Sequence, residues 1–329
     1  MGYAAAKPLP PEAIPVVDIE PLRTGADPKA VAAALHAAST GLGFIYVKGH
    51  GIPRELIDGA RRAAYGFFRA EALQKATVAV AGTHRGWLGR GGARMQDDAP
   101  VDLKESFIWG FEDATGQTPQ DHPLRGANRW PDFLPALRHH SMAYFTAAHQ
   151  VAQHLLRGFA LGLDLAEDFF LRSAATPISR ASYVYYPPQD AALGAEQFGV
   201  GPHTDFGVLT VLCQDDVGGL QVQDKSGDWL VAPPIDGTLV VNVGDLLARW
   251  TDGVYISTPH RVVNTSGRER LSLVLAFDPD PDTVIDSREI FGPDHLGAQP
   301  ATTCGDYLLW RFERAFAYRQ SASHGEPAP

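Results

Sequence analysis

A histidine and an aspartate stand one residue apart in the stretch 201-GPHTDFGVLTVL-212, as His203 and Asp205. Side chains alternate between the two faces of a strand, so the pair would share one face with Leu209 and Val211. A carboxylate on a buried face needs a charged partner or a metal ion. The alternative is a polar turn before a strand, because His-X-Asp triplets also occur by chance.

A third ligand would have to come from another strand. His260, in the segment STPHRVVN, begins an apolar strand far along the chain from Asp205. Two imidazoles and one carboxylate form the ligand set of non-haem Fe(II) oxygenases, which leaves the opposite coordination positions open. Taken alone, His260 would be interpreted as an ordinary core or surface histidine.

The strand predicted over residues 270–277, RLSLVLAF, would add an anion-binding group. One face of this strand carries Arg270, Ser272, Val274 and Ala276. If that face is inward, a guanidinium and a hydroxyl project into the cavity of the metal. Arginine binds carboxylates through two parallel hydrogen bonds, and an unpaired buried arginine is costly, so a bound anion is expected. The alternative is an ion pair with Asp245 or Asp278.

The elements that position these residues fall into two parts. Asp27 can cap a helix over 27–40, with Pro28 at its first position. Further helices are predicted over 53–68 and 131–163, strands over 14–19, 44–51 and 104–111, and a Gly/Arg-rich loop over 82–98. After Pro177, strand-like runs follow one another at 178–186, 208–214, 219–223, 229–232, 238–244, 260–264 and 270–277. This spacing indicates a sandwich or barrel of antiparallel strands, and residues 302–319 return to a helical period.

Composition excludes several classes of protein. The 329 residues are 45% hydrophobic and 20% charged, as in ordinary folded proteins. With a net charge of −10 and no cluster of Lys and Arg, nucleic acid and membrane are not expected as partners. We see no secretory signal, and with Cys213 and Cys304 as the only cysteines we expect the cytoplasm. The sequence does not fix the oligomeric state.

The motifs, taken in order, resemble a known family. The order H-T-D, STPHRVVN and R-L-S, together with IPVVDI, GFIYVKGHGIP, KESFIWG, YYPP and GGLQV, resembles the Fe(II)/2-oxoglutarate-dependent dioxygenases of the isopenicillin N synthase-like group. The resemblance implies a mainly β fold with flanking α: a double-stranded β-helix, or jelly roll, with an N-terminal helical region and a C-terminal helix. We expect one structural unit with a tail over 1–13, an N-terminal region over 14–120, a helical connection over 121–177, a core over 178–280 and a C-terminal helix and tail over 281–329.

The resemblance also implies roles for residues. His203, Asp205 and His260 match the iron ligands, Arg270 and Ser272 match the grip on the distal carboxylate of 2-oxoglutarate, and Tyr186 matches a donor to the same cosubstrate. Two positions depart from the pattern. Val184 stands where many members have asparagine, and Ala276 stands where flavonoid-acting members have an aromatic residue, which argues against a flavonoid substrate.

The implied activity is hydroxylation or desaturation of a small organic molecule with Fe(II), 2-oxoglutarate and O2, releasing succinate and CO2. A small residue at position 205 would free a site for halide, so Asp205 argues against a halogenase. The alternatives are a same-fold oxidase without 2-oxoglutarate, of the isopenicillin N synthase or ACC oxidase type, a zinc hydrolase on the same ligands, and a binding module. Candidate pocket aromatics, each with core packing as the alternative, are Phe107, Trp109, Phe206 and Trp87.

Overall fold

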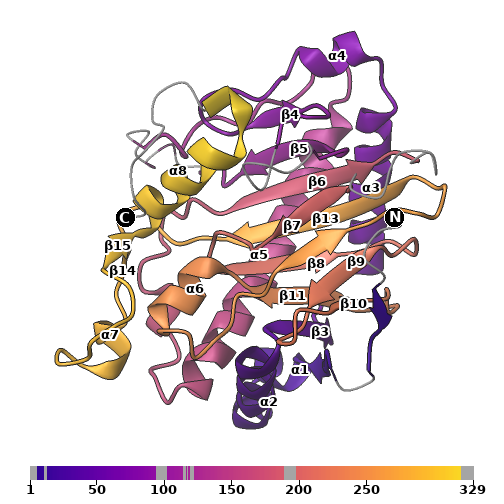
Figure 1. The fold of residues 1–329 in the computed structure, drawn as a ribbon. Helices are drawn as coiled ribbons and strands as arrows, with labels where there is room; N and C mark the ends of the chain where they lie inside the picture. Colours follow the sequence, from indigo (N-terminus) through magenta and orange to yellow (C-terminus); the bar gives the residue numbers. More distant parts are fainter. Residues whose placement is uncertain are drawn as a thin grey trace.

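The computed structural model describes residues 6–10, 13–93, 102–113, 116, 118, 122–188 and 198–319. Two sheets dominate this part of the chain (Figure 1). The larger has the order β2 (Val16–Asp18), β3 (Phe44–Lys48), β11 (Leu239–Val243), β8 (Leu209–Cys213), β13 (Arg270–Phe277), β6 (Arg180–Tyr186), β5 (Glu105–Gly110) and β4 (Gly86–Leu88). The smaller has the order β1 (Lys7–Pro8), β10 (Trp229–Val231), β9 (Leu220–Gln223), β12 (His260–Val262) and β7 (Val200–His203).

The pairing is antiparallel except for β2 on β3 and β1 on β10. A small apolar cluster joins the two sheets, with Phe44 and Tyr186 from the larger and Leu220 and Val262 from the smaller. This is the double-sheet arrangement of the predicted jelly roll. The larger sheet combines strands from the predicted N-terminal region and from the predicted core, so these two stretches share one sheet.

Helices cover the outer face of the larger sheet (Figure 1). The long helix α5 (Ala136–Gly162) packs against β8, β13, α2 (Pro28–Gly41) and α3 (Arg54–Phe68). Its Tyr144 hydroxyl donates to the carbonyl of Leu273 at 3.1 Å, and Ser141 donates to the Tyr183 hydroxyl at 2.9 Å. Leu273 and Tyr183 lie on adjacent strands, so the helix fixes which face of β13 and β6 turns away from the cavity.

The predicted cap of α2 is confirmed, since the Ala30 amide donates to the Asp27 carboxylate at 3.1 Å and Pro28 is the first helical residue. The remaining helices are α1 (Glu20–Thr24), α4 (Ala72–Ala76), α6 (Asp245–Trp250), α7 (Arg288–Phe291), α8 (Cys304–Ala315) and the short 3₁₀ turns η1 (Phe169–Leu171) and η2 (Ala317–Arg319). The last pair of strands is β14 (Val284–Ile285) and β15 (Thr302–Thr303).

Several boundaries differ from the prediction. The described part of the 82–98 loop contains β4, which pairs with β5, and residues 94–98 lie outside the described residues. The helix predicted from 131 begins at Ala136, after Pro131 and Pro135. No described helix is both long and apolar enough to cross a bilayer.

Candidate metal centre

The connection between β7 and β8 carries the first two predicted ligands from one sheet to the other. His203 is the last residue of β7 in the smaller sheet, and Asp205 lies beyond the strand, before β8 begins at Leu209 in the larger sheet. The turn packs tightly: a Cβ on Gly244 would overlap the carbonyl of Gly207. The two ligands therefore meet because the chain crosses between sheets, and strand alternation does not run through the crossing.

This crossing corrects one prediction from the sequence. Leu209 and Val211 are buried in the core that the helices share with the larger sheet, and do not lie on the face of His203 and Asp205. Thr210 and Leu212 line the cavity instead. The alternation of side chains begins anew at β8. The apolar run 208–212 therefore could not predict which way His203 and Asp205 point.

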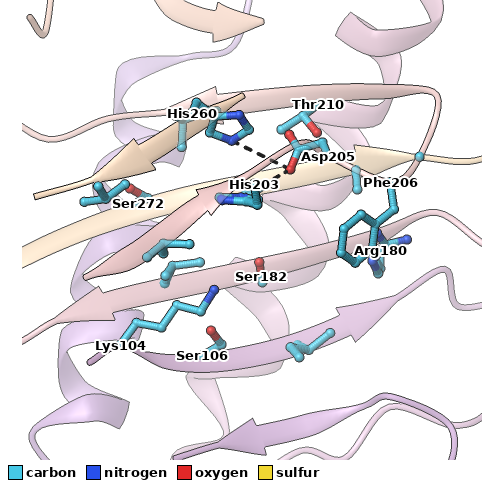
Figure 2. A pocket seen from close by; sticks show the side chains of 18 of the residues that line it. Lys104, Ser106, Arg180, Ser182, His203, Asp205, Phe206, Thr210, His260 and Ser272 are labelled. Carbon is cyan, nitrogen blue, oxygen red and sulfur yellow. Dashed lines mark ion pairs between the residues drawn. The ribbon is translucent and has the colours of Figure 1, made fainter. Parts of the chain in front are cut away.

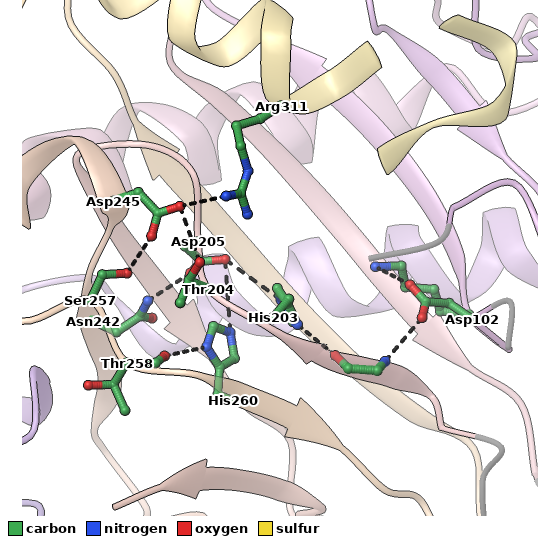
Figure 3. Close-up of polar contacts among 12 residues, drawn as sticks. Asp102, His203, Thr204, Asp205, Asn242, Asp245, Ser257, Thr258, His260 and Arg311 are labelled. Carbon is green, nitrogen blue, oxygen red and sulfur yellow. Dashed lines mark hydrogen bonds and ion pairs between the residues drawn. The ribbon is translucent and has the colours of Figure 1, made fainter. Parts of the chain in front are cut away.

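The third ligand is placed by strand pairing. His260, the first residue of β12, stands directly opposite His203 of β7. The Nε2 atoms of His203 and His260 lie 3.8 and 3.9 Å from Asp205 Oδ1, and one ligand atom from each residue falls within 4.8 Å of the others (Figures 2 and 3). These separations exceed hydrogen-bonding distance, so the three atoms converge on a space that suits an ion.

Both imidazoles are oriented by backbone carbonyls. His203 Nδ1 lies 2.8 Å from the carbonyl of Gly201, and His260 Nδ1 lies 3.2 Å from the carbonyl of Thr258. A carbonyl can only accept, so Nδ1 carries the proton in each neutral ring and Nε2 presents its lone pair. This is the outer hydrogen bonding that metal-bound histidines use.

The protonation states also suit a metal. Burial and the neighbouring His260 lower the pKa of His203 to about 3. Burial raises the pKa of Asp205, but the charges of His260 and His203 and the hydrogen bond from Asn242 outweigh it, and the pKa falls to about 2. The Asn242 amide donates to Oδ2 at 2.7 Å, which leaves Oδ1 facing the imidazoles. A neutral imidazole and an ionised carboxylate are the forms that bind metals.

A second carboxylate, Asp245, ties the ligand-bearing segments together (Figure 3). Its amide donates to the carbonyl of Asp205 at 2.7 Å, and its side chain accepts from Thr204 at 3.1 Å and from Ser257 at 2.7 Å. Tyr307 and Arg311 of α8 also contact it, at 3.1 and 3.3 Å. The C-terminal helix thus braces the site. Asn242 and Asp245 were not identified as supports from the sequence, and no pattern around them signals that role.

Arg270 lies in the same cavity, fully buried. It donates to the carbonyl of Gly218 at 2.5 Å, to the Ser272 hydroxyl at 2.7 Å and to the Gln214 side chain at 3.5 Å. Among the described residues no carboxylate pairs with it. The two carboxylates considered from the sequence are engaged elsewhere, because Asp278 pairs with Arg180 at 2.5 Å and Asp245 with Arg311. The guanidinium is therefore a buried charge in need of an anion.

Register places Tyr186 beside this arginine. The two residues stand opposite each other on β6 and β13, and the guanidinium carbon lies 4.6 Å from the centre of the Tyr186 ring. Burial raises the pKa of Tyr186 to about 12, so its hydroxyl remains a donor. Ser272 stands opposite Val184, the position where many members of the resembled group have asparagine.

The cavity lies between the two sheets, with Lys104 and Ser106 on one side of it and the metal cluster on the other (Figure 2). Its walls also include residues around β4 and helix α8. The predicted inward face of β13 is confirmed, since Arg270, Ser272, Val274 and Ala276 all line the cavity. Residues on this lining that the sequence did not single out individually include His84, Lys104, Ser106, Arg180, Ser182, Thr210, Asn242, Phe312 and Phe316. The alternate polar positions of β5 and β6 were the one available signal for Ser106 and Ser182.

Of the four predicted pocket aromatics, Phe206 lines the cavity. Phe107 and Trp109 lie on the opposite face of β5, where Phe107 packs on Phe67 and Trp109 on Tyr183. Trp87 does not line the cavity either: its indole donates to Glu105 at 2.9 Å. Both faces of β5 are buried, so hydrophobicity alone could not tell them apart.

Comparison with known proteins agrees with the geometry. Residues 175–279 match the family described as the 2OG-Fe(II) oxygenase superfamily. Residues 14–133 match the family described as the non-haem dioxygenase in morphine synthesis N-terminal. The two matched ranges contain the metal centre and the N-terminal elements that flank the cavity.

Two curated relatives and one solved structure are similar over most of the chain. The 2-oxoglutarate-Fe(II) type oxidoreductase ppzC of Metarhizium majus is 36% identical over 286 residues, covering 80% of this chain and 76% of that protein. The homoarginine-6-hydroxylase 2-ODD-C23 of Glycine max is 34% identical over 292 residues, covering 83% and 87%. The crystal structure of a full-length Neurospora crassa protein in complex with alpha-KG superposes with a TM-score of 0.81 at 25% identity, covering 94% and 99%.

Proposed function

Because the chain belongs to the 2OG-Fe(II) oxygenase superfamily, and so acts on a small molecule with Fe(II) and 2-oxoglutarate, we propose that it hydroxylates or desaturates its substrate. Succinate and CO2 are the expected co-products. The observation that carries the proposal is a single cavity that holds both a three-residue metal-binding cluster and a buried arginine with no carboxylate partner among the described residues.

His203, Asp205 and His260 are the proposed ligands of Fe(II). Their donor atoms come from two strand ends and a connection and lie close together, so these three side chains would hold the ion and leave positions for other ligands. When bound there, Fe(II) would supply, with 2-oxoglutarate and O2, the oxidation of a C–H bond of the substrate. Asn242 and the carbonyls of Gly201 and Thr258 hold the three side chains in the orientation that binding requires.

Arg270, Ser272 and Tyr186 are the proposed binding site of the distal carboxylate of 2-oxoglutarate. The arginine is stacked on Tyr186 and hydrogen-bonded to Ser272, so its remaining donors are held in one orientation before the cosubstrate binds. Val184, Val200, Leu220 and Val262 line the cavity around this end. Apolar walls exclude water and strengthen the charge pairing that fixes the cosubstrate.

Fe(II) binding tests the metal role. Anaerobic addition of Fe(II) and 2-oxoglutarate to the apoprotein should produce a weak visible charge-transfer band from the chelate. Asp205→Ala should lose the band and coupled succinate formation, because it removes a ligand and lets water in its place. Full activity in Asp205→Ala would contradict the ligand assignment.

The same titration separates the proposal from an oxidase that uses no 2-oxoglutarate. In wild type the band should require both components, and Arg270→Ala should need far more 2-oxoglutarate to form it. Succinate released in step with product in air supports the proposal. Product formed without 2-oxoglutarate would favour the oxidase.

We propose that the protein is located in the cytoplasm. We also propose that neither nucleic acid nor a membrane is its partner. Cys213 and Cys304 are both free and buried, which suits a reducing compartment.

A further inference from the structure

The charged residues of the cavity lining are unevenly distributed. The described lining residues include three permanent cations, Lys104, Arg180 and Arg270, and one carboxylate, Asp205. Asp205 belongs to the metal centre and Arg270 to the proposed cosubstrate site. Lys104 and Arg180 are therefore the charged lining residues that the proposed chemistry does not use.

Arg180 and Arg270 lie at opposite ends of the part of the larger sheet that lines the cavity. It is six positions before Tyr186 on β6, and Tyr186 pairs with Arg270, whereas Arg180 pairs with Ala276. At the rise of a β-strand, six residues separate the two ends by about 20 Å. A five-carbon diacid bound to Arg270 and to the metal cannot also reach Arg180, so this guanidinium is available to a different molecule.

The Arg180 side chain is held in place with donors to spare. One guanidinium nitrogen donates to Asp278 at 2.5 Å, and the guanidinium carbon lies 4.7 Å from the centre of the Phe312 ring. No other hydrogen bond joins the guanidinium to a described residue. Asp278 is fully buried behind the arginine and does not line the cavity, so the positive group faces the cavity and the negative group does not.

The surroundings of Arg180 are rich in positive charge. Burial, and then the charges of Arg180, Arg85, Arg319 and Lys104, lower the pKa of His84, which lines the cavity. Arg85 is buried and donates to the carbonyls of neighbouring backbone, and Arg319 donates to the carbonyl of Gly82.

Few carboxylates balance these cations. Among the described residues the carboxylates paired with this group are Asp278, with Arg180, and Asp102, with Lys104 at 3.3 Å. A cation would meet repulsion here, whereas an anion would be attracted.

Aromatic side chains cover the same end of the cavity. Phe206 follows the ligand Asp205, and Phe312 and Phe316 come from the end of α8 and the residue after it. Phe206 and Phe312 have ring centres 6.1 Å apart. A ligand bound to Arg180 would thus place its carbon skeleton against rings and beside the metal ligand Asp205.

We propose that the primary substrate is a small organic carboxylate whose charged group binds Arg180 and whose carbon skeleton packs against Phe206, Phe312 and Phe316. This inference rests on the proposed oxygenase function, because it places the skeleton next to the iron and the carboxylate away from it. Arg180 is then a specificity-determining residue of the substrate end.

Binding to the anaerobic enzyme loaded with Fe(II) and 2-oxoglutarate tests the proposal. The probes are benzoate, phenylacetate and 3-phenylpropionate, each compared with the primary amide and the primary amine of the same skeleton. Acids should perturb the visible band with dissociation constants about tenfold or more below those of the amides, since charge-assisted pairs are the stronger ones. The amines should not bind. If wild type shows no band at all, the proposed function fails, and this inference with it.

Variants assign the preference to Arg180. Because Arg180→Gln alone would leave Asp278 buried and unpaired, the double variant Arg180→Gln/Asp278→Asn is the main probe. It should form the band and lose the preference for acids, while Arg180→Lys retains part of it. Lys48→Met removes one exposed positive charge outside the cavity and should bind the acids as wild type does.

Three results would overturn the proposal. The first is binding of amides or amines as tight as that of the acids, or no response to any acid in wild type that forms the band. The second is an unchanged preference for acids in the double variant. The third is a preference for acids that is kept in Arg180→Gln/Asp278→Asn but lost in Lys104→Met/Asp102→Asn. That result would assign the anion to Lys104.

Discussion

The two ends of the cavity carry the same residue type in different surroundings. Arg270 is surrounded by neutral acceptors, the Gly218 carbonyl, the Ser272 hydroxyl and the Gln214 amide. Arg180, at the other end of the same sheet face, is backed by the buried carboxylate of Asp278. Both side chains are confined by an aromatic ring, Tyr186 for one and Phe312 for the other.

The difference indicates when each charge is balanced. At the Arg180 end the fold supplies a counterion for that one side chain, so this guanidinium is paired before any ligand arrives, while the cations around it leave the end positive. At the Arg270 end no described carboxylate does so, and the charge is balanced when an anion binds. One end should therefore matter more for stability, and the other for binding of the cosubstrate.

The largest expected effect is on folding. Asp278→Asn keeps the acceptor for the Val208 amide but leaves Arg180 without a counterion. Breaking a buried pair in this way should lower the free energy of unfolding by about 3–5 kcal/mol. Arg270→Met, at the other end, should change it by less than about 1 kcal/mol, because it removes a charge that no described carboxylate pairs. Urea unfolding followed by circular dichroism measures both.

The double variant Arg180→Met/Asp278→Asn is the control for that contrast. Burial raises the pKa of Asp278 despite the charge of Arg180, so the intact pair contributes little net stability. Removing both charges should recover most of what Asp278→Asn loses. A loss in Arg270→Met as large as that in Asp278→Asn would contradict the distinction between the two ends.

The sequence predicted the two ends to different extents. Alternation along 270–277 was sufficient to place Arg270 and Ser272 on one inward face, because β13 is regular over its whole length. It also predicted that His203 and Asp205 share a site, although the physical cause is a crossing between sheets. Leu209 and Val211 were placed wrongly for the same reason.

The position and partner of Arg180 could not be predicted from the sequence. Its counterion Asp278 lies 98 residues away and meets it through the pairing of β6 with β13, which no local pattern reports. On β5 the aromatic residues Phe107 and Trp109 were predicted to line the cavity. The alternate residues Ser106 and Ile108 line it instead. A strand buried on both faces carries no hydrophobic signal for direction.

Acid should lower the free energy of unfolding through a histidine that packs behind the Arg180 end. His149 of α5 lies behind it, stacked on Phe145 and with Nε2 3.2 Å from the hydroxyl of Ser179. Burial lowers the pKa of His149 from 6.5 to about 4. Between these values the unfolded chain binds a proton that the folded chain does not. The free energy of unfolding should therefore fall as the pH decreases from about 6.5 to about 4, by up to about 3 kcal/mol from this residue.

The variant His149→Gln isolates that contribution, because glutamine can bond to Ser179 and does not titrate. Urea unfolding at a series of pH values should show a shallower dependence in the variant than in wild type over this range. Parallel curves would mean that His149 does not set the acid sensitivity.

Substitutions of Arg270, at the other end of the cavity, should weaken binding of 2-oxoglutarate. Arg270→Gln should raise the KM for 2-oxoglutarate about 100-fold, since it removes one partner of a buried charged pair. Arg270→Lys should recover little, because an ammonium lacks the planar fork. Arg180→Lys provides the comparison and should leave the KM for 2-oxoglutarate within about threefold of wild type, because Arg180 lies about 20 Å along the strand. Steady-state succinate assays measure these constants, and equal effects at both arginines would remove the distinction.

The smallest effect tests whether the neutral acceptors around Arg270 hold it in place. Ser272→Ala removes the hydroxyl that accepts from the guanidinium at 2.7 Å and that would donate to the incoming carboxylate. Loss of one such bond should raise the KM for 2-oxoglutarate about three- to tenfold and leave kcat close to wild type. Ser182→Ala, a matched change on the cavity face of β6 nearer Arg180, should leave that KM unchanged. If the two serine variants behaved alike, the hydroxyl would be a general polar lining and Arg270 would be positioned by its strand and Tyr186 alone.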